Sequence, residues 1–154
     1  MTALLRLRKH LATDLPMPKW PTGSRLLPLA GAEPRDLHAI LENAYVNGFG
    51  SVPPFEPWWT GLTTDSEFDA SLVFIAADGD LRPIGVALCW TAGFVKDIGV
   101  VSAWRGQGIG EALLREAFRA FHQRGLTQVD LKVMTGNTTA VALYHRVGMV
   151  EAPL

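Results

Sequence analysis

The chain has little cysteine, little net charge and no long apolar run, and each scarcity excludes a class of protein. Its single cysteine, Cys89, excludes an internal disulfide and a cysteine-based zinc site, and agrees with a reducing cytoplasm. The 14 basic and 15 acidic side chains nearly cancel, unlike the charge excess of proteins that bind nucleic acids or acidic membranes. No apolar stretch is long enough to span a bilayer, and basic residues interrupt the opening leucines, unlike a signal peptide. We therefore expect a cytoplasmic protein that binds no metal, nucleic acid or membrane.

The remaining composition is that of one domain of ordinary size. A chain of 154 residues lies near the usual domain length and can bury about two-thirds of its unfolded surface. Residues 1–24 are rich in proline and are predicted to form an N-terminal arm laid on the surface, followed by one domain over residues 25–154. Cys89 lies in an apolar stretch, which favours a small buried hydrophobe over a nucleophile.

Hydrophobic spacing and turn signals divide the domain into strands and helices. Apolar stretches separated by glycine turns predict an antiparallel meander, and the later helices are expected to end at Gly125, in an αL cap, and at Gly148. The stretch 51–62 contains several prolines and is expected to be irregular. Strands are predicted at residues 25–29, 72–77, 84–90, 94–101 and 128–134, and helices at residues 34–47, 108–124 and 138–147. This order predicts an α/β domain with a mixed, mostly antiparallel sheet flanked by helices.

The glycine-rich turn RGQGIG, residues 105–110, lies between an apolar strand and an amphipathic helix. Glycines let the chain approach an anion without a Cβ in the way, and the free N–H groups of a first helical turn donate hydrogen bonds. The order strand, turn, helix therefore predicts a phosphate-binding turn. Two alternatives stay open. One is a plain tight turn, and the other is a dinucleotide fingerprint, for which Asp130 stands at about the expected distance although Glu111 takes the place of its last glycine.

Two segments resemble a known family. The segment VVSAWRGQGIGEALL is similar to the acetyl-coenzyme A motif of the GNAT superfamily of N-acetyltransferases, with Arg105, Gly108 and Gly110 at the motif positions. The downstream segment NTTAVALYHRVGM is similar to the last helix of the same family. Its matching residues are Asn137, Ala140, Leu143, Tyr144, Gly148 and Met149. Two such motifs in the right order are more specific than either alone.

The resemblance implies a single-domain GNAT-like fold whose central strands splay apart to admit acetyl-coenzyme A, the implied cosubstrate. Backbone groups of Ile98 and Val100 would pair with its pantetheine arm, and the amides of residues 106–111 would hold its diphosphate. Asn137 would contribute side-chain donors there, and it is also a candidate N-cap. The implied cofactor-binding residues are Ile98, Gly99, Val100, Arg105, Gly106, Gln107, Gly108, Ile109, Gly110, Glu111, Asn137 and Tyr144.

The resemblance also implies an acyltransferase that passes an acetyl group directly to a primary amine of a small molecule, peptide or protein. Tyr144 is where the family places the catalytic acid for the departing sulfur, a role suited to a phenol. Backbone N–H groups near Val100 would stabilise the developing oxyanion. His145 must point to another face of the helix and is expected on the surface. A catalytically silent coenzyme A-binding module remains the alternative function.

The base and the acceptor stay open. Lys132 occupies the place of a carboxylate that some relatives use as the base. The remaining candidates are a water relay or the side chains of Asp130, Asp97, Glu56 and His38. Aromatic rings in the middle of the chain are interpreted either as core or as a floor for the acceptor amine. They belong to Phe55, Trp58, Trp59 and Trp90.

The end of the chain raises one more expectation. After Gly148 too few residues follow for the pair of closing strands that many relatives use beside the acceptor. Either the N-terminal arm or a partner subunit would complete that side, so a homodimer is a hypothesis.

Overall fold

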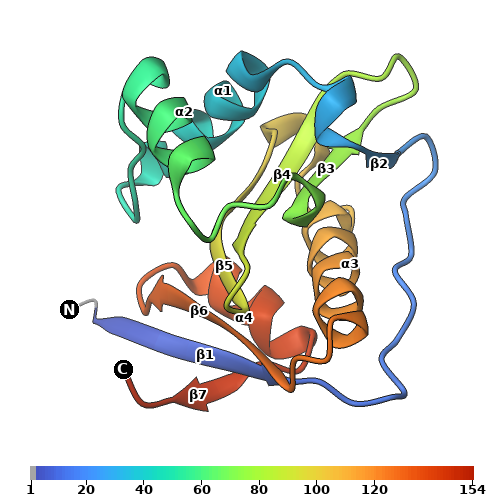
Figure 1. Cartoon of the computed structure of the whole chain (residues 1–154), viewed down its shortest axis with the longest axis vertical. Coiled ribbons are helices and arrows are strands. Elements are labelled where there is room, and N and C mark those ends of the chain that lie inside the picture. Colours follow the sequence, from blue (N-terminus) through green and yellow to red (C-terminus); the bar gives the residue numbers. More distant parts are fainter. Residues whose placement is uncertain (1–2) are drawn as a thin grey trace.

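The computed structural model describes residues 3–154 and contains a seven-stranded mixed sheet in the order β2-β3-β4-β5-β6-β1-β7 (Figure 1). Only β5 and β6 run parallel, and every other neighbouring pair is antiparallel. The expected α/β class with a mostly antiparallel sheet is therefore confirmed. The strands are β1 (Leu4–His10), β2 (Arg25–Leu27), β3 (Val73–Ala77), β4 (Pro83–Trp90), β5 (Phe94–Val100), β6 (Gln128–Met134) and β7 (Val150–Ala152).

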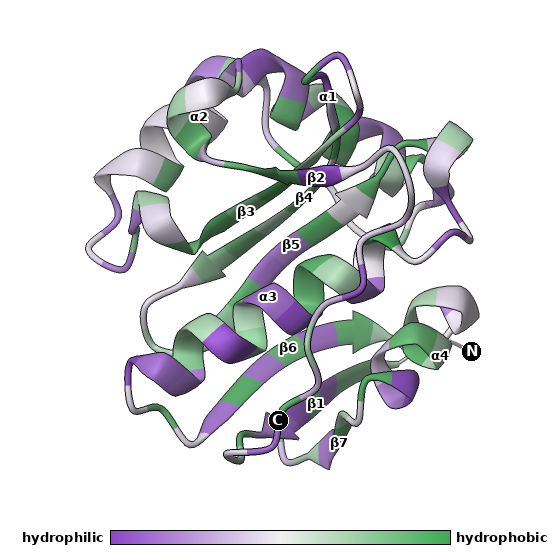
Figure 2. Ribbon diagram, turned by 90° about the vertical axis from the view of Figure 1, so that its right-hand side faces the viewer, coloured by the Kyte–Doolittle hydropathy of each residue, from purple (hydrophilic) through white to green (hydrophobic). Residues whose placement is uncertain are grey.

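Four α-helices cover the two faces of the sheet within the described residues. They are α1 (Pro34–Ala44), α2 (Phe55–Thr64), α3 (Ile109–Gln123) and α4 (Thr138–Arg146), with short 3-10 turns at Leu29–Gly31, Tyr45–Asn47, Ala70–Leu72 and Ser102–Trp104. Helices α1 and α2 share a core with β2, β3 and β4, whereas α3 and α4 pack on the opposite face. Figure 2 looks onto the face that α3 crosses. No helix in residues 3–154 combines the length and hydrophobicity needed to cross a membrane.

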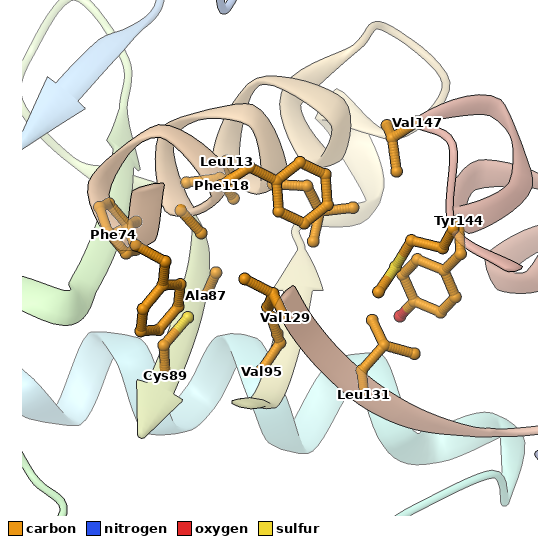
Figure 3. Close-up of a cluster of buried hydrophobic side chains, with 14 of the residues drawn as sticks. Phe74, Ala87, Cys89, Val95, Leu113, Phe118, Val129, Leu131, Tyr144 and Val147 are labelled. Carbon is orange, nitrogen blue, oxygen red and sulfur yellow. The ribbon is translucent and has the colours of Figure 1, made fainter. Parts of the chain in front are cut away.

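The core under α3 explains why that segment is helical. Its buried side chains recur at helical spacing and include Leu113 and Phe118, which lie against Val95 and Val129 of the sheet (Figure 3). Cys89 is also part of this core, and burial raises the pKa of its thiol. The helix ends at Gln123, and Gly125 follows with φ +85°, so the expected αL cap is confirmed.

The expectation of an irregular stretch at residues 51–62 is wrong, because α2 begins at Phe55. Pro54 lies at the N-cap, and the first helical hydrogen bond runs from Trp58 N to Pro54 O at 3.0 Å. Pro57 therefore occupies a position whose N–H would have no helical partner. The prolines lie at the start of this helix and do not break it. Among its aromatic residues, Trp58 is buried, with 3% of its surface exposed.

The predicted surface arm needs correction as well. Residues 4–10 form β1, which pairs with β6 over its full length and with β7 at three positions. Leu7 points into the core and is completely buried. The alternation of leucine with arginine in LLRLRKH is the period-two pattern of a strand. The prolines that follow it led to the prediction of an arm instead. From Leu11 to Ser24 the chain has no regular element, and residues 1 and 2 of the predicted arm lie outside the described residues.

Strand β1 thereby completes the sheet beside β6. Of the two ways to complete it that the sequence left open, the N-terminal segment is the one observed. The pairing is reinforced by Asp130 of β6, whose carboxylate accepts hydrogen bonds from Arg6 at 2.8 Å and from Arg8 at 2.8 and 3.0 Å. The Arg8 guanidinium, followed by that of Arg6, holds the pKa of Asp130 below its usual range.

If β1 belongs to the folded core, Leu7→Ala should destabilise the protein by about 2–5 kcal/mol, because it empties a buried site. The matched change Leu4→Ala alters the same strand at a side chain that is 43% exposed, and should cost within about 0.5 kcal/mol. Urea unfolding of both variants measures the difference. Equal midpoints for the two would contradict the placement of β1.

Candidate active site

Strands β5 and β6 pair at only one register, Phe94 with Asp130, and diverge from there (Figure 2). At this junction Asp130 N donates a hydrogen bond to Gly93 O at 2.9 Å. The expected splay of the central strands is therefore confirmed. A groove of about 970 Å³ lies along β5, the start of α3 and the start of α4, and is called the α3–α4 groove below.

The backbone of β5 presents free donors to this groove. Val101 N donates to Ile84 O of the neighbouring β4 at 2.9 Å. Successive residues of a strand direct their N–H groups to opposite sides, so those of Val100 and Ile98 point away from β4 and toward the groove. The Val100 carbonyl on the same side accepts a hydrogen bond from Arg105 Nε at 2.9 Å. Since β6 has moved away, the N–H groups of Ile98 and Val100 remain for another partner.

The glycine-rich turn supplies a second set of donors. Gly106 and Gly108 have φ of +75° and +97°, a backbone region that side chains with a Cβ adopt only at a cost. The first helical bond of α3 runs from Ala112 N to Gly108 O. Within residues 3–154, the N–H groups of residues 106–111 donate to no backbone acceptor. They lie at the positive end of the α3 macrodipole, an arrangement suited to an anion.

Two further features shape the turn. A Cβ added to Gly110 would lie 3.0 Å from Leu143 Cδ2, so this glycine allows α3 to approach α4 closely. The one acidic side chain of the turn, Glu111, is ion-paired with Arg146 at 3.0 Å and with Arg115 at 3.2 Å. These guanidinium groups, Arg146 first, lower the pKa of Glu111 and offset its charge beside the free amides.

The structure brings the predicted cofactor residues together. All of them except Gln107 line the α3–α4 groove: Ile98, Gly99, Val100, Arg105, Gly106, Gly108, Ile109, Gly110, Glu111, Asn137 and Tyr144. The Gln107 side chain instead donates to Ala103 O at 3.1 Å. Asn137 occupies the N-cap of α4 but makes no capping hydrogen bond, so the capping role considered for it is not observed.

A smaller cavity of about 230 Å³, called the inner pocket below, adjoins the groove. The two share six lining residues, which makes them one passage through the splay: Ala44, Phe49, Ile98, Asn137, Ala140 and Tyr144. Tyr144 is 6% exposed and lies between α4 and β6, with its ring near Leu131 (Figure 3). The phenol that the sequence singled out is therefore at the junction of the two cavities.

A β-bulge in β5 forms one wall of the inner pocket. The register changes from Leu88 opposite Asp97 to Cys89 opposite Val95, which leaves Lys96 as the extra residue. Val95 packs in the core under α3. Asp97 instead accepts a hydrogen bond from Tyr45, which follows α1, and Lys96 Nζ lies 2.7 Å from its other oxygen. Bulges re-aim side chains in this way beside functional sites.

Both phenols of the site are held neutral. Burial raises the pKa of Tyr144 to about 12, and the negative charge of Asp97 contributes in the same direction. Burial also raises the pKa of Tyr45, with Asp97 again adding to the shift. Both hydroxyls therefore keep their protons at neutral pH.

The four candidate bases have different surroundings. Only Asp97 lines the inner pocket. Asp130 is held between two arginines in the sheet, and Glu56 is an exposed partner of Arg35 at 3.2 Å. His38 is buried, with Nε2 2.7 Å from Pro53 O. The last three line neither cavity.

The proposed aromatic floor for an acceptor is not formed, because Phe55, Trp58, Trp59 and Trp90 line neither cavity and pack in the core under α1 and α2. Other lining residues were not predicted. They include Ala44, Tyr45, Phe49 and Lys96, in or near the loop after α1 and the bulge, where no recognisable motif occurs. Trp104 and Arg146 also line the groove, and they lie inside the two motif segments at positions that the motifs do not specify. His145 is exposed, as expected.

The family model described as "Acetyltransferase (GNAT) family" matches residues 35–149. The chain belongs to the GNAT family. It is similar to the mycothiol acetyltransferase of Thermobispora bispora, with 31% identity over 97% of this chain and 54% of that protein. A solved GCN5-related N-acetyltransferase from Sphaerobacter thermophilus superimposes with a TM-score of 0.81 at 31% identity, over 97% of this chain and 48% of that one. The chain thus spans about half the length of these relatives.

A more distant neighbour shares the GNAT fold alone. The NatC complex bound to Gag peptide and CoA matches with a TM-score of 0.64 at 18% identity, covering 86% of this chain and 87% of that one. The dinucleotide-fold alternative is wrong, since the strand before the glycine turn, β5, pairs antiparallel with β4 and not within a βαβ unit.

The site predicts an unusual tyrosine titration. The chain has 2 tyrosines, both at the inner pocket, and ordinary phenols ionise near about pH 10. Absorbance at 295 nm should show no tyrosinate in the folded protein at pH 10.5. In the Tyr45→Phe variant, one tyrosine transition should remain, that of Tyr144, with a pKa of about 12. Because the folded state favours the neutral phenols, stability should be intact below pH 10 and fall as the pH rises toward 12. A folded-state transition at pH 10 would contradict this.

Proposed function

We propose that the protein is an acetyl-coenzyme A-dependent N-acetyltransferase that transfers the acetyl group directly to a primary amine of a small molecule, peptide or protein. One observation carries the proposal: unpaired N–H groups of residues 106–111 at the start of α3 open onto a groove that leads along β5 to Tyr144. The three parts of acetyl-coenzyme A match this site in order: the dianionic diphosphate matches the turn, the amide-bearing arm matches the groove along β5, and the thioester matches the end at Tyr144.

The residues present fit this cosubstrate. The glycine turn offers donors and the helix dipole to the diphosphate, while Arg105 and Arg146 add positive charge along the groove. The N–H groups of Ile98 and Val100 face the groove in strand spacing and would pair with the amides of pantetheine. These donors need no side chain to move, because the backbone already leaves them free.

The chemistry then follows from the passage between the cavities. The neutral amine, entering through the inner pocket, attacks the acetyl carbonyl, and the developing oxyanion is stabilised by a backbone N–H group of β5 near Val100. When the C–S bond breaks, Tyr144 donates its proton to the sulfur, which its raised pKa allows because the phenol is protonated at neutral pH. The proton of the amine leaves toward Asp97, directly or through water, and Asp97 also attracts the acceptor's ammonium form.

Direct transfer is favoured over a covalent enzyme intermediate. Cys89 is the only thiol, it is 3% exposed, and it lines neither cavity. Burial also raises its pKa, which removes the thiolate that would act as a nucleophile. Within the described residues the two cavities therefore present an acid and hydrogen-bond donors, and no thiol that would carry the acetyl group.

Gly108→Ala tests the turn. Alanine at φ +97° should cost about 1–2 kcal/mol of stability and displace the amides, weakening acetyl-coenzyme A binding by about tenfold or more in calorimetry. Gly125→Ala is the control, because it places alanine at φ +85° at the other end of α3 and should cost similar stability with unchanged affinity. Equal affinities for the two variants, or thermal stabilisation by a nicotinamide dinucleotide and not by acetyl-coenzyme A, would sink the assignment.

Tyr144→Phe tests the acid. The variant should lower kcat by about a hundredfold or more, while the affinity for acetyl-coenzyme A stays nearly constant, because only the hydroxyl that protonates sulfur is lost. Release of free thiol with a panel of amines measures turnover. Unchanged turnover would refute the role of Tyr144, and binding without thiol release from the unmodified protein would leave only a silent coenzyme A-binding module.

A further inference from the structure

The inner pocket has an uncompensated positive charge. Its charged lining residues are Lys96, Asp97 and Lys132. Lys96 and Asp97 form an ion pair at 2.7 Å that adds no net charge, and the Asp97 carboxylate still lies on the pocket wall. Lys132 makes no ion pair with any side chain of residues 3–154, although the chain as a whole has a formal charge of −1. The charged side chains that line the inner pocket therefore sum to a positive charge, whereas the whole chain has a slightly negative one.

The strand next to Lys132 increases this charge. Lys132 lies directly opposite Arg6 in the β1–β6 register, and residues directly opposite share a face of the sheet. Like charges in such a pair are destabilising. Arg6 and Arg8 share one carboxylate, that of Asp130. These neighbours of Lys132 on β1 and β6 therefore also have an excess of positive charge. No acidic side chain in residues 3–154 relieves Lys132.

Lys132 is exposed, and it also lines the inner pocket, the cavity that the proposed acceptor would enter. At one wall of that cavity, Asp97 is suited to an amine, and Tyr144 lies at its exit to the groove. At another wall, on β6, the ammonium of Lys132 is suited to an anion. In a pocket of about 230 Å³ that both residues line, these two groups would meet one small portion of the acceptor.

We propose that the acceptor has a carboxylate or phosphate group close to its primary amine, with Lys132 holding the anion while Asp97 and Tyr144 face the amine. This rests on the proposed acetyl transfer. An acceptor with several positive charges would place one of them beside Lys132 and be repelled. The pocket thus selects against polycationic amines and for amines of amino-acid or phosphorylated-amine type.

The test compares matched acceptors with the unmodified protein. Glycine against glycinamide and β-alanine against its amide examine a carboxylate, and phosphoethanolamine against ethanolamine examines a phosphate, each followed by thiol release over a pH range so that the fraction of free amine is known. The anionic member of at least one series should have a kcat/KM about tenfold higher or more. The series that shows the preference identifies the anion.

Variants connect the preference to the residue. Lys132→Gln should reduce the ratio of anionic to neutral kcat/KM toward one, mainly through KM, with unchanged acetyl-coenzyme A affinity, and Lys132→Arg should restore it. Lys19→Gln, an exposed lysine that lines neither cavity, is the matched control and should keep the full ratio. Low ionic strength should raise the ratio of the unmodified protein and leave that of Lys132→Gln unchanged.

The outcomes separate the two proposals. If amines are acetylated but neutral or cationic members are preferred, or Lys132→Gln keeps the preference, the acceptor assignment is overturned and acetyl transfer stands. If no amine in any series releases thiol and acetyl-coenzyme A does not bind, acetyl transfer fails and the acceptor assignment fails with it.

Discussion

The separation of β5 from β6 is the constraint on which the site depends. A strand that loses its neighbour is left with backbone N–H and C=O groups that need other partners. After the single register of Phe94 with Asp130, this loss leaves the N–H groups of β5 facing the α3–α4 groove, while Arg105 takes the carbonyl of Val100. The same gap lies between the groove and the inner pocket, and Tyr144 lines both cavities.

Full pairing on the outer sides stabilises this open centre. Strand β4 pairs with β5 along its length on one side, and β1 pairs with all of β6 on the other. A Cβ on Gly99 would lie 3.0 Å from Ala44 Cβ, so the absence of a side chain there lets α1 rest directly on β5. The N-terminal strand is thus as much a part of the site's architecture as the glycine turn, because without it β6 would have no partner beyond Phe94.

Charge is sorted across the two cavities. Along the groove, Glu111 is paired with arginines and the amides of the turn remain positive in effect. At the inner pocket, the bulge at Lys96 directs Asp97 toward Tyr45, and burial keeps both phenols protonated. Lys132 on the facing strand is the charge left over. In the acetyl transfer proposed above, Tyr144 would protonate the sulfur, Asp97 would face the amine and Lys132 would select the acceptor.

Local patterns were sufficient for the elements with a strong signal. The glycine turn, the cap at Gly125 and the phenol of the last helix were predicted, because glycine conformations and motif spacing act over a few residues. Local rules misjudged residues 51–62, where Pro57 occupies a helical position that needs no N–H donor, and they left Phe55 and its aromatic neighbours undecided between core and acceptor site.

By itself, the sequence determined the family, the order of most elements and many of the residues that line the groove. Only the tertiary structure decided that residues 4–10 join the sheet, that Asp97 and not Asp130 reaches the pocket, and that Lys132 is left without a counter-charge. The reason is physical: these facts depend on pairs more than 30 residues apart, such as Arg8 with Asp130 at a separation of 122 and Tyr45 with Asp97 at 52. No local spacing encodes such contacts, because they exist only once the strands have paired.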